Sequence, residues 1–566
     1  MVGNSFFKRG FATLVISMST ILFNLVKDKV YKDDLIKEVS FNSQGEIMAW
    51  IFDFKSQALS KIFLQEYAKS FWDIFQSKFG SSVQIGGMET GAIPLITGVT
   101  VYSPSNINVS SFYIRKSRKK SDLANQVEGD IQKDTPIILV DDIINNGNTI
   151  RKQIKILEEA GHKVSAIFTC LRFRSISHYQ DLLDRGIDIV SIFELNDFSN
   201  DLPVKNLITK DGGLVTKKYT IDYKITLTKK PNLYLVIPKS APILCGEYVY
   251  MGADDGTIHC IRTSDGSTEW IYKILFGTKG KNIFSSPQIY KDKILFGAYD
   301  GNFYCLNRFT GKREWVFSDA DWIGSSPSID YGRGTAFIGL EFGLFKKRGG
   351  VAALDIQTGK VKWRNYSMVG LTHASPAYNK RYNIVICGCN DNYVYAFNAK
   401  NGEILWKFET KGEVKYGAIF DDKRGLVIIA SMDGGLYVLR IKDGSLYHTF
   451  EARFGFYATA AMSGNLIVIG SLDKLVYCFN ILSKKTEWIF ETSGRIFASP
   501  AIDRESVFIG SNDGRLYELD VRSGRFIGSV QLTERIVNKI QVEPETEVER
   551  ILYVPTHTGE LYKIRG

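Results

Sequence analysis

The stretch Ile137–Ile150, IILVDDIINNGNTI, combines residue types that could hold a sugar phosphate. Four apolar residues lead into two adjacent carboxylates, Asp141 and Asp142, and then into the short polar loop Asn145–Asn148, which contains Gly147. The following segment, RKQIKILEEAGHKV, carries apolar residues at near-helical spacing. A strand, two acids at its end, a compact loop and a helix N-terminus are therefore predicted in succession. Free backbone N–H groups and the helix dipole would take the phosphate, and the carboxylates would take ribose hydroxyls.

An alternation of strands and helices is predicted to position this motif. Apolar runs predict strands near 83–86, 110–114, 137–141 and 164–171, and helical patterns follow Gly91 and cover 149–160 and 177–185. Such alternation is typical of a parallel α/β sheet, in which ligands bind at the carboxyl ends of the strands. The fold class predicted for this part of the chain, about 1–215 including an N-terminal helix over 1–30, is therefore α/β.

The two acids and their loop resemble the PRPP-binding motif of type I phosphoribosyltransferases. In that family the acids bind the 2′ and 3′ hydroxyls of 5-phosphoribosyl-1-pyrophosphate (PRPP), and the loop wraps its 5′-phosphate. Most of residues 30–200 resembles the orotate branch: 41–59 resembles the hood over the base, and Ile85–Ile96, IGGMETGAIPLI, resembles the loop that meets pyrophosphate. Its glycines, Gly86, Gly87 and Gly91, would permit close approach of the diphosphate. The resemblance implies substrate contacts from Thr90, Gly91, Asp141, Asp142, Asn145, Asn146, Gly147, Asn148 and Thr149.

A basic segment, FYIRKSRKK at 112–120, resembles the mobile loop that closes over the active site in this family. The resemblance implies catalytic contacts from Arg115, Lys116 and Lys119 to the leaving pyrophosphate. It also matches Arg172 to the arginine that binds the orotate carboxylate, although a strand-end arginine can equally form a surface salt bridge. Magnesium would be bound through PRPP, near the two acids, with no direct protein cage.

Two departures from the family leave three hypotheses open. The basic loop has Ser121-Asp122 where the family usually has His-Gly, and the PRPP loop has Asn145 and Asn146 where threonine is usual. The leading hypothesis is a PRPP-dependent enzyme of pyrimidine nucleotide metabolism. The alternatives are a module that binds PRPP or another ribose phosphate without turnover, and a scaffold. The resemblance further suggests a homodimer that exchanges basic loops.

Composition sets the remaining limits. A chain of 566 residues predicts at least two domains, and a net charge of +10 without a polybasic arm gives no support for nucleic-acid binding. The seven scattered cysteines, of which only Cys387 and Cys389 lie close, argue against zinc and favour reduced thiols in a cytoplasmic protein. The apolar stretch 11–26 is predicted to be a packed helix, the alternative being a membrane anchor.

The second part, about 216–566, is a repeat array. Tryptophans stand at 270, 315, 363 and 406, and the same place is assigned to Tyr447, Trp488 and Phe526. Each unit opens with a small-residue strand such as SSPQI or ASPAI, has a hairpin signal such as Asp300-Gly301, and has a turn such as Thr310-Gly311 before its aromatic residue. Four short strands in about 40 residues form one propeller blade. Each Trp is expected to pack between blades.

The motifs D-G-x-x-Y-x-L and T-G-x-x-x-W resemble the PQQ-like repeat family. Seven complete units and a partial eighth predict an all-β propeller of eight blades, with seven as the alternative. A strand near 219–228 would complete the last blade and close the ring. Quinone-dependent dehydrogenases with such repeats usually carry a disulfide between two adjacent cysteines. This chain has no Cys-Cys pair, so no PQQ is expected. The propeller is instead predicted to dock a protein partner.

Overall fold

The computed structural model describes residues 20–32, 51–78, 81–115, 126–199, 202, 217–233, 237–276, 282–344, 347–543 and 549–566. The chain forms two compact units, Met1–Asn206 and Leu207–Gly566. The boundary predicted at 215 falls within 203–216, outside the described residues.

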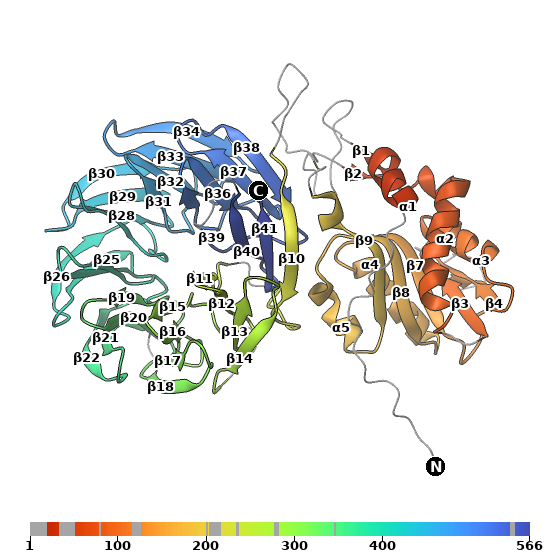
Figure 1. Cartoon of the computed structure of the whole chain (residues 1–566), viewed down its shortest axis with the longest axis horizontal. Helices are drawn as coiled ribbons and strands as arrows, with labels where there is room; N and C mark the ends of the chain where they lie inside the picture. Colours follow the sequence, from red (N-terminus) through yellow and green to blue (C-terminus); the bar gives the residue numbers. More distant parts are fainter. Residues whose placement is uncertain are drawn as a thin grey trace, which may run out of the picture. The chain divides into compact units, whose positions relative to one another are not determined.

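A five-stranded parallel sheet forms the centre of the first unit (Figure 1). Its spatial order is β4 (Asn108–Ser111), β3 (Ser82–Gly86), β7 (Ile137–Ile144), β8 (Val164–Arg172) and β9 (Asp188–Glu194). This arrangement confirms the predicted α/β class. The α-helices of this unit are α1 (Thr20–Leu25), α2 (Lys61–Phe75), α3 (Ala92–Val101), α4 (Asn148–Glu159) and α5 (Gln180–Leu183). A π-helix, η1 (Val26–Val30), and three short 3₁₀ helices, η2 (Gln57–Leu59), η3 (Ile176–Tyr179) and η4 (Leu195–Phe198), accompany them. Two small strand pairs complete the unit: β1 (Tyr31–Lys32) with β2 (Ile51–Phe52), and β5 (Tyr113–Ile114) with β6 (Val127–Glu128).

Both faces of this sheet are buried, because β7 alternates its side chains between two cores. Ile138 and Val140 pack into one core with α2 and α3, and Ile137 and Leu139 pack into the other with α4. Of the predicted N-terminal helix, the structure describes α1, whose Leu22 is fully buried. Residues 11–19 lie outside the described part. In the part of the chain that the structure describes, no helix has the length and apolar character needed to cross a membrane.

The second unit consists of eight four-stranded antiparallel sheets arranged around an axis, which confirms the eight-bladed prediction (Figure 1). Blade 1 contains β11 (Ile243–Cys245), β12 (Tyr248–Gly252), β13 (Thr257–Arg262) and β14 (Thr268–Lys273); blade 2 contains β15 (Gln288–Tyr290), β16 (Lys293–Gly297), β17 (Asn302–Asn307) and β18 (Arg313–Ser318); blade 3 contains β19 (Ser328–Asp330), β20 (Thr335–Phe342), β21 (Arg348–Asp355) and β22 (Val361–Met368); blade 4 contains β23 (Ala377–Asn379), β24 (Ile384–Gly388), β25 (Tyr393–Asn398) and β26 (Ile404–Glu409). Blade 5 contains β27 (Ile419–Asp421), β28 (Leu426–Ala430), β29 (Gly435–Arg440) and β30 (Leu446–Glu451); blade 6 contains β31 (Ala461–Ser463), β32 (Leu466–Gly470), β33 (Leu475–Asn480) and β34 (Lys485–Glu491); blade 7 contains β35 (Ala501–Asp503), β36 (Ser506–Gly510), β37 (Arg515–Asp520) and β38 (Phe526–Gln531); blade 8 contains β39 (Gln541–Glu543), β40 (Ile551–Pro555), β41 (Glu560–Arg565) and β10 (Thr220–Thr226).

The ring closes through β10, as the sequence predicted. This strand pairs antiparallel with β41, from Thr220 opposite Arg565 to Thr226 opposite Glu560. It supplies the outer strand that the last repeat lacks, so that the first and last strands of the propeller share one sheet. Pairing satisfies a strand edge that would otherwise be exposed.

Tryptophans join neighbouring blades, as expected. The indole N–H of Trp363 donates to the carbonyl of Ala399 in the next blade at 3.0 Å, and its ring covers Gly402, where an added Cβ would lie 2.4 Å from the indole. Four further tryptophans repeat both contacts: Trp270 with Gly311, Trp315 with Gly359, Trp406 with Gly444 and Trp488 with Gly524. Glycine at these turns therefore serves interblade packing.

The predicted assignment of Tyr447 and Phe526 to the tryptophan place is wrong. Trp270 pairs with Cys260 at the bulge of blade 1, and the residues at the same register in blades 5 and 7 are His448 and Gly528. In each of these blades the tryptophan position lies four residues after the turn residue with positive φ, as Trp270 follows Gly266 in blade 1. The sequence prediction chose a nearby aromatic residue and did not count from this turn. In blade 8 the equivalent residue is Tyr223, which packs against Gly266 of blade 1.

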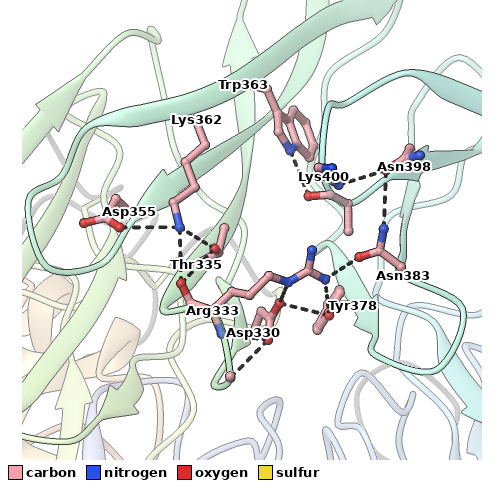
Figure 2. A network of polar contacts seen from close by, with 12 residues as sticks. Asp330, Arg333, Thr335, Asp355, Lys362, Trp363, Tyr378, Asn383, Asn398 and Lys400 are labelled. Atoms are coloured by element: carbon pink, nitrogen blue, oxygen red, sulfur yellow. Dashed lines mark hydrogen bonds and ion pairs between the residues drawn. The ribbon is translucent and has the colours of Figure 1, made fainter.

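Polar side chains also connect blades, as Figure 2 shows for blades 3 and 4. Arg333 donates from Nε to the buried carboxylate of Asp330 at 2.5 Å, and from Nη2 to Tyr378 Oη at 2.9 Å and to Asn383. Burial opposes ionisation of Asp330, but the hydrogen bonds from Arg333 and Tyr378 outweigh it and lower the pKa of this carboxyl. The nearly inaccessible carboxylate of Asp330 thus connects the first strand of blade 3 to Tyr378 of blade 4.

Candidate functional site

The phosphate loop follows β7 and leads into α4. Gly147 has φ +74° and caps the helix, and an added Cβ would lie 2.8 Å from Arg151 Nη1, so this position requires glycine. The amide of Asn148 donates to Asn146 Oδ1 at 3.0 Å. Among the described residues, the backbone N–H groups of Asn146, Gly147, Thr149 and Ile150 have no acceptor. Such amides, aligned with the positive end of the helix, form an anion site.

Two side chains that sequence reasoning missed hold this loop. Arg151 Nη1 donates to the carbonyl of Asn146 at 2.7 Å, and the same guanidinium forms an ion pair with Asp181, Nη2 to Oδ1 at 2.6 Å. The hydrogen bond from Arg151 is the largest cause of the lowered pKa of Asp181. The hydroxyl of Tyr179 donates to the carbonyl of Asn145. Arg151 stands four residues after Gly147 and was recognisable, whereas Tyr179 comes from a separate segment.

The paired acids lie inside β7 and not beyond its end, because the strand continues to Ile144. Both carboxylates are half-buried. Asp141 Oδ1 accepts from the amide of Asp142 at 3.0 Å, and Asp142 Oδ1 accepts from the amide of Ile143 at 2.7 Å. The buried hydroxyl of Tyr67 donates to the carbonyl of Asp141 at 3.2 Å. Burial and then the charges of Cys170 and the two acids raise the pKa of Tyr67.

The loop after β3 lies at the same sheet edge, because β3 and β7 are parallel neighbours. Glycine at 86 and 87 is required by internal packing: an added Cβ would lie 2.2 Å from the Phe112 ring at Gly86 and 2.6 Å from the Val140 carbonyl at Gly87. At Gly91 no atom lies within 4 Å of that position. Gly91 and Thr90 are exposed, which keeps the predicted pyrophosphate contact open.

The described start of the basic segment lies beside this loop. Ile114 N–H donates to the carbonyl of Gly87 at 2.8 Å, and Arg115 forms an ion pair with Glu128, Nη1 to Oε1 at 2.7 Å. That hydrogen bond is the largest cause of the raised pKa of Arg115. Lys116 and Lys119, together with Ser121 and Asp122, lie outside the described residues.

Arg172 ends β8 and forms an ion pair with Glu194 at the end of the neighbouring β9. Its side chain is 6% exposed, and Nη1 also donates to the carbonyl of Arg174. Arg172 is therefore engaged in a salt bridge, as the alternative interpretation held, but the arginine of this pair is buried and not at the surface. Arg174, which sequence reasoning did not single out, is half-buried and donates from Nε to Asn145 Oδ1 at 3.1 Å.

The donor set fits magnesium only in the presence of a phosphate ligand. Among the described residues, no group of three or more His, Cys, Asp or Glu side chains could hold a metal ion. Asp141 and Asp142 offer two carboxylates at most, and a hard cation needs about six oxygen ligands. Diphosphate oxygens and water would have to supply the remainder.

These two units define a protein class in which a phosphoribosyltransferase-type α/β unit is joined to an eight-bladed propeller. The model of the family described as outer membrane protein assembly factor BamB matches residues 226–365 and 390–564, more than half of the chain. The first unit is 31% identical over 155 residues to orotate phosphoribosyltransferase of Listeria innocua, covering 27% of this chain and 72% of that protein. The chain therefore belongs to the BamB propeller family and, through its first unit, to the orotate phosphoribosyltransferase family.

Further similarities are to a second orotate phosphoribosyltransferase and to two solved propeller structures. Orotate phosphoribosyltransferase of Listeria monocytogenes is 26% identical over 155 residues, again 27% of this chain and 72% of that protein. The BamB structure from Moraxella catarrhalis matches with a TM-score of 0.50 and 16% identity over 62% of this chain and all of that one. A europium-containing methanol dehydrogenase matches with a TM-score of 0.53 and 13% identity over 61% of this chain and 93% of that one. At such identities the two structures show the propeller fold alone.

Proposed function

We propose that the first unit binds PRPP with magnesium and transfers its phosphoribosyl group to a base, with orotate as the nearest candidate and pyrimidine nucleotide metabolism in the cytoplasm as the setting. One observation carries this proposal. Backbone N–H groups on either side of Gly147, at the N-terminus of α4, have no acceptor within the described residues, and they follow Asp141 and Asp142 in the chain by only a few residues. Anionic phosphate fits the amides, and ribose hydroxyls fit the carboxylates.

The proposed reaction forms no covalent enzyme intermediate. Pyrophosphate leaves the anomeric carbon of the ribose, and a nitrogen of the base adds to it. Arg115, Lys116 and Lys119 stabilise the charge that grows on the leaving group, and each contact lowers the barrier by about 2–4 kcal/mol. Arg115 would have to exchange Glu128 for the diphosphate. Magnesium, when bound, neutralises the diphosphate.

A second candidate is PRPP binding without turnover. Arg172, matched to the orotate-binding arginine, is nearly buried and paired with Glu194. A guanidinium engaged in this way recognises an external carboxylate only if it leaves its partner. In this case the first unit acts as a ligand-responsive module, and the propeller docks a protein partner.

The test is a titration of the full-length protein with PRPP and magnesium, followed by an assay of product formation with orotate and a panel of bases. The double variant Asp141→Asn/Asp142→Asn should weaken PRPP binding at least tenfold, because each lost charge-assisted hydrogen bond contributes about 1.5–3 kcal/mol. Asp130→Asn/Asp134→Asn makes the same charge change at exposed positions and is the matched control.

The outcomes separate the candidates. PRPP-dependent product formation supports the enzyme, and PRPP binding without product for any base supports the module. Equal PRPP affinity in the wild type and the Asp141→Asn/Asp142→Asn variant would overturn both. The predicted homodimer is tested separately by sedimentation of the same preparation.

A further inference from the structure

The propeller encloses a cavity of about 720 Å³ on its axis, a volume in the range of small-molecule sites. Each blade contributes one residue to the cavity at the same place, two positions before its innermost strand. We refer to these eight residues as the axial ring: Ala241, Ser286, Ser326, Ser375, Gly417, Thr459, Ser499 and Lys539. Seven of them are small, and the eighth is a lysine.

The serines of the axial ring present hydroxyl donors to the cavity. Each serine oxygen accepts from a backbone N–H of the preceding blade at 2.9 Å: the donors are Ala241, Ser286, Ser326 and Thr459, and the acceptors are Ser286, Ser326, Ser375 and Ser499. A hydroxyl that accepts in this way still has its own proton to donate. For these four hydroxyls the described residues provide no acceptor.

Lys539 adds the one lining cation for which the described residues provide no ion pair or hydrogen bond. Its side chain is accessible from the cavity, and enclosure by the walls lowers its pKa. The other two lining lysines have acidic partners, Lys239 with the buried Asp254 and Lys415 with Glu413. The Nδ1 atom of His373 lies 2.9 Å from the buried carboxylate of Glu341. Among the described residues, no Asp or Glu lines the cavity itself. Among the lining lysines, Lys539 is therefore the one whose charge has no acidic partner within the described residues.

Three phenols provide further donors. Tyr299, Tyr416 and Tyr457 line the cavity, and their hydroxyls have no partner among the described residues. The Tyr416 and Tyr457 rings lie 5.1 Å apart between centroids. Burial raises the pKa of all three, so they remain protonated donors. Ammonium, phenol and serine groups together demand a ligand rich in acceptors.

We propose that the axial cavity binds a small oxyanion, either a phosphate or a carboxylate, through the ammonium group of Lys539 and the hydroxyls that surround it. The ligand's oxygens accept the protons that the protein leaves without an acceptor, and its charge balances that of Lys539. A neutral or cationic ligand would leave this charge uncompensated. This site is independent of the function proposed for the first unit.

Calorimetric titration of the full-length protein with inorganic phosphate and with malonate, at constant ionic strength in chloride, tests the proposal. Lys539→Ser gives the eighth blade the residue that four other blades carry, and it should weaken binding at least about tenfold. Tyr416→Phe removes a hydroxyl that makes no bond within the described residues, so the fold is preserved, and it should weaken binding about two- to tenfold. Lys442→Ser, at an exposed hairpin turn, is the matched control and should change nothing.

The first unit is identical in all these variants, so any anion bound there contributes equally and cancels in the comparison. Loss of phosphate binding alone assigns the site to phosphoryl ligands, and loss of malonate binding alone assigns it to carboxylates. The proposal is overturned if neither probe binds the wild type, or if Lys539→Ser and Tyr416→Phe bind both probes as tightly as the wild type does.

Discussion

The interface between blades 5 and 6 has His448 and Lys484 where five other interfaces have Trp and Gly, and the two replacements should be energetically coupled. At those five glycines an added Cβ would lie 2.4 to 2.7 Å from the facing indole. Lys484 already carries a Cβ at this place. His448→Trp alone therefore overpacks the interface and should destabilise the propeller by about 1–3 kcal/mol.

Lys484→Gly alone should be close to neutral. It removes the cost of φ +58° in a non-glycine residue, about 1–2 kcal/mol. Two costs oppose this gain. The contact of Lys484 Nζ with the Tyr447 ring at 4.4 Å is lost, which costs about 0.5–1 kcal/mol. The glycine also makes the unfolded chain more flexible, which lowers the free energy of unfolding by about 0.4–1 kcal/mol. The double variant has room for the indole and an interblade hydrogen bond, so a coupling of about 2–4 kcal/mol is expected.

Differential scanning calorimetry of the four full-length proteins measures this coupling. In a unit of this size, 1 kcal/mol shifts Tm by about 1–2 °C. The propeller transition should fall in His448→Trp and return to or above the wild-type value in the double variant. Additive shifts, or a single His448→Trp variant as stable as the double one, would refute the packing argument.

Two further predictions concern single residues. Gly147→Ala should destabilise the first unit by about 1–2 kcal/mol, and it should weaken PRPP binding because the added Cβ would meet Arg151. Gly161→Ala is the control, since Gly161 also has a positive φ, +82°, but no atom lies within 4 Å of its added Cβ. The control should leave PRPP affinity unchanged in the same calorimetric titration. Arg333→Ala should cost the propeller about 1–3 kcal/mol at pH 7. Since the folded pKa of Asp330 is lowered, its stabilisation is present above the unfolded pKa of about 4 and is lost as pH falls through the folded value. The Tm difference between Arg333→Ala and wild type should therefore shrink as the pH is lowered from 7 through the acid range, and a difference that stays constant down to the onset of acid unfolding would contradict this assignment.

Patterns that repeat or stay local were predictable from the sequence. The phosphate loop and its helix follow one another within a short stretch, and the blade count follows from a repeated turn and aromatic residue. Even the closing strand was predictable, because the partial eighth repeat lacks its fourth strand.

Long-range partners were not predictable in this way. Tyr67 reaches Asp141 from α2, and Arg172 finds Glu194 only because β8 and β9 are neighbours. The place of His448 depends on a bulge that shifts the register after the turn, a feature that aromatic spacing does not reveal. Lys539 becomes conspicuous only when equivalent residues of all eight blades meet on the axis.

The pairing of β10 with β41 has a consequence for biosynthesis. A ribosome completes β10 more than 300 residues before its partner in the last blade emerges. Throughout that interval the nascent chain carries an unsatisfied strand edge next to a growing, open arc of blades. Such an edge invites wrong pairing between neighbouring chains, so slow translation of the last repeat should favour aggregation, and chaperones that shield β10 should relieve it.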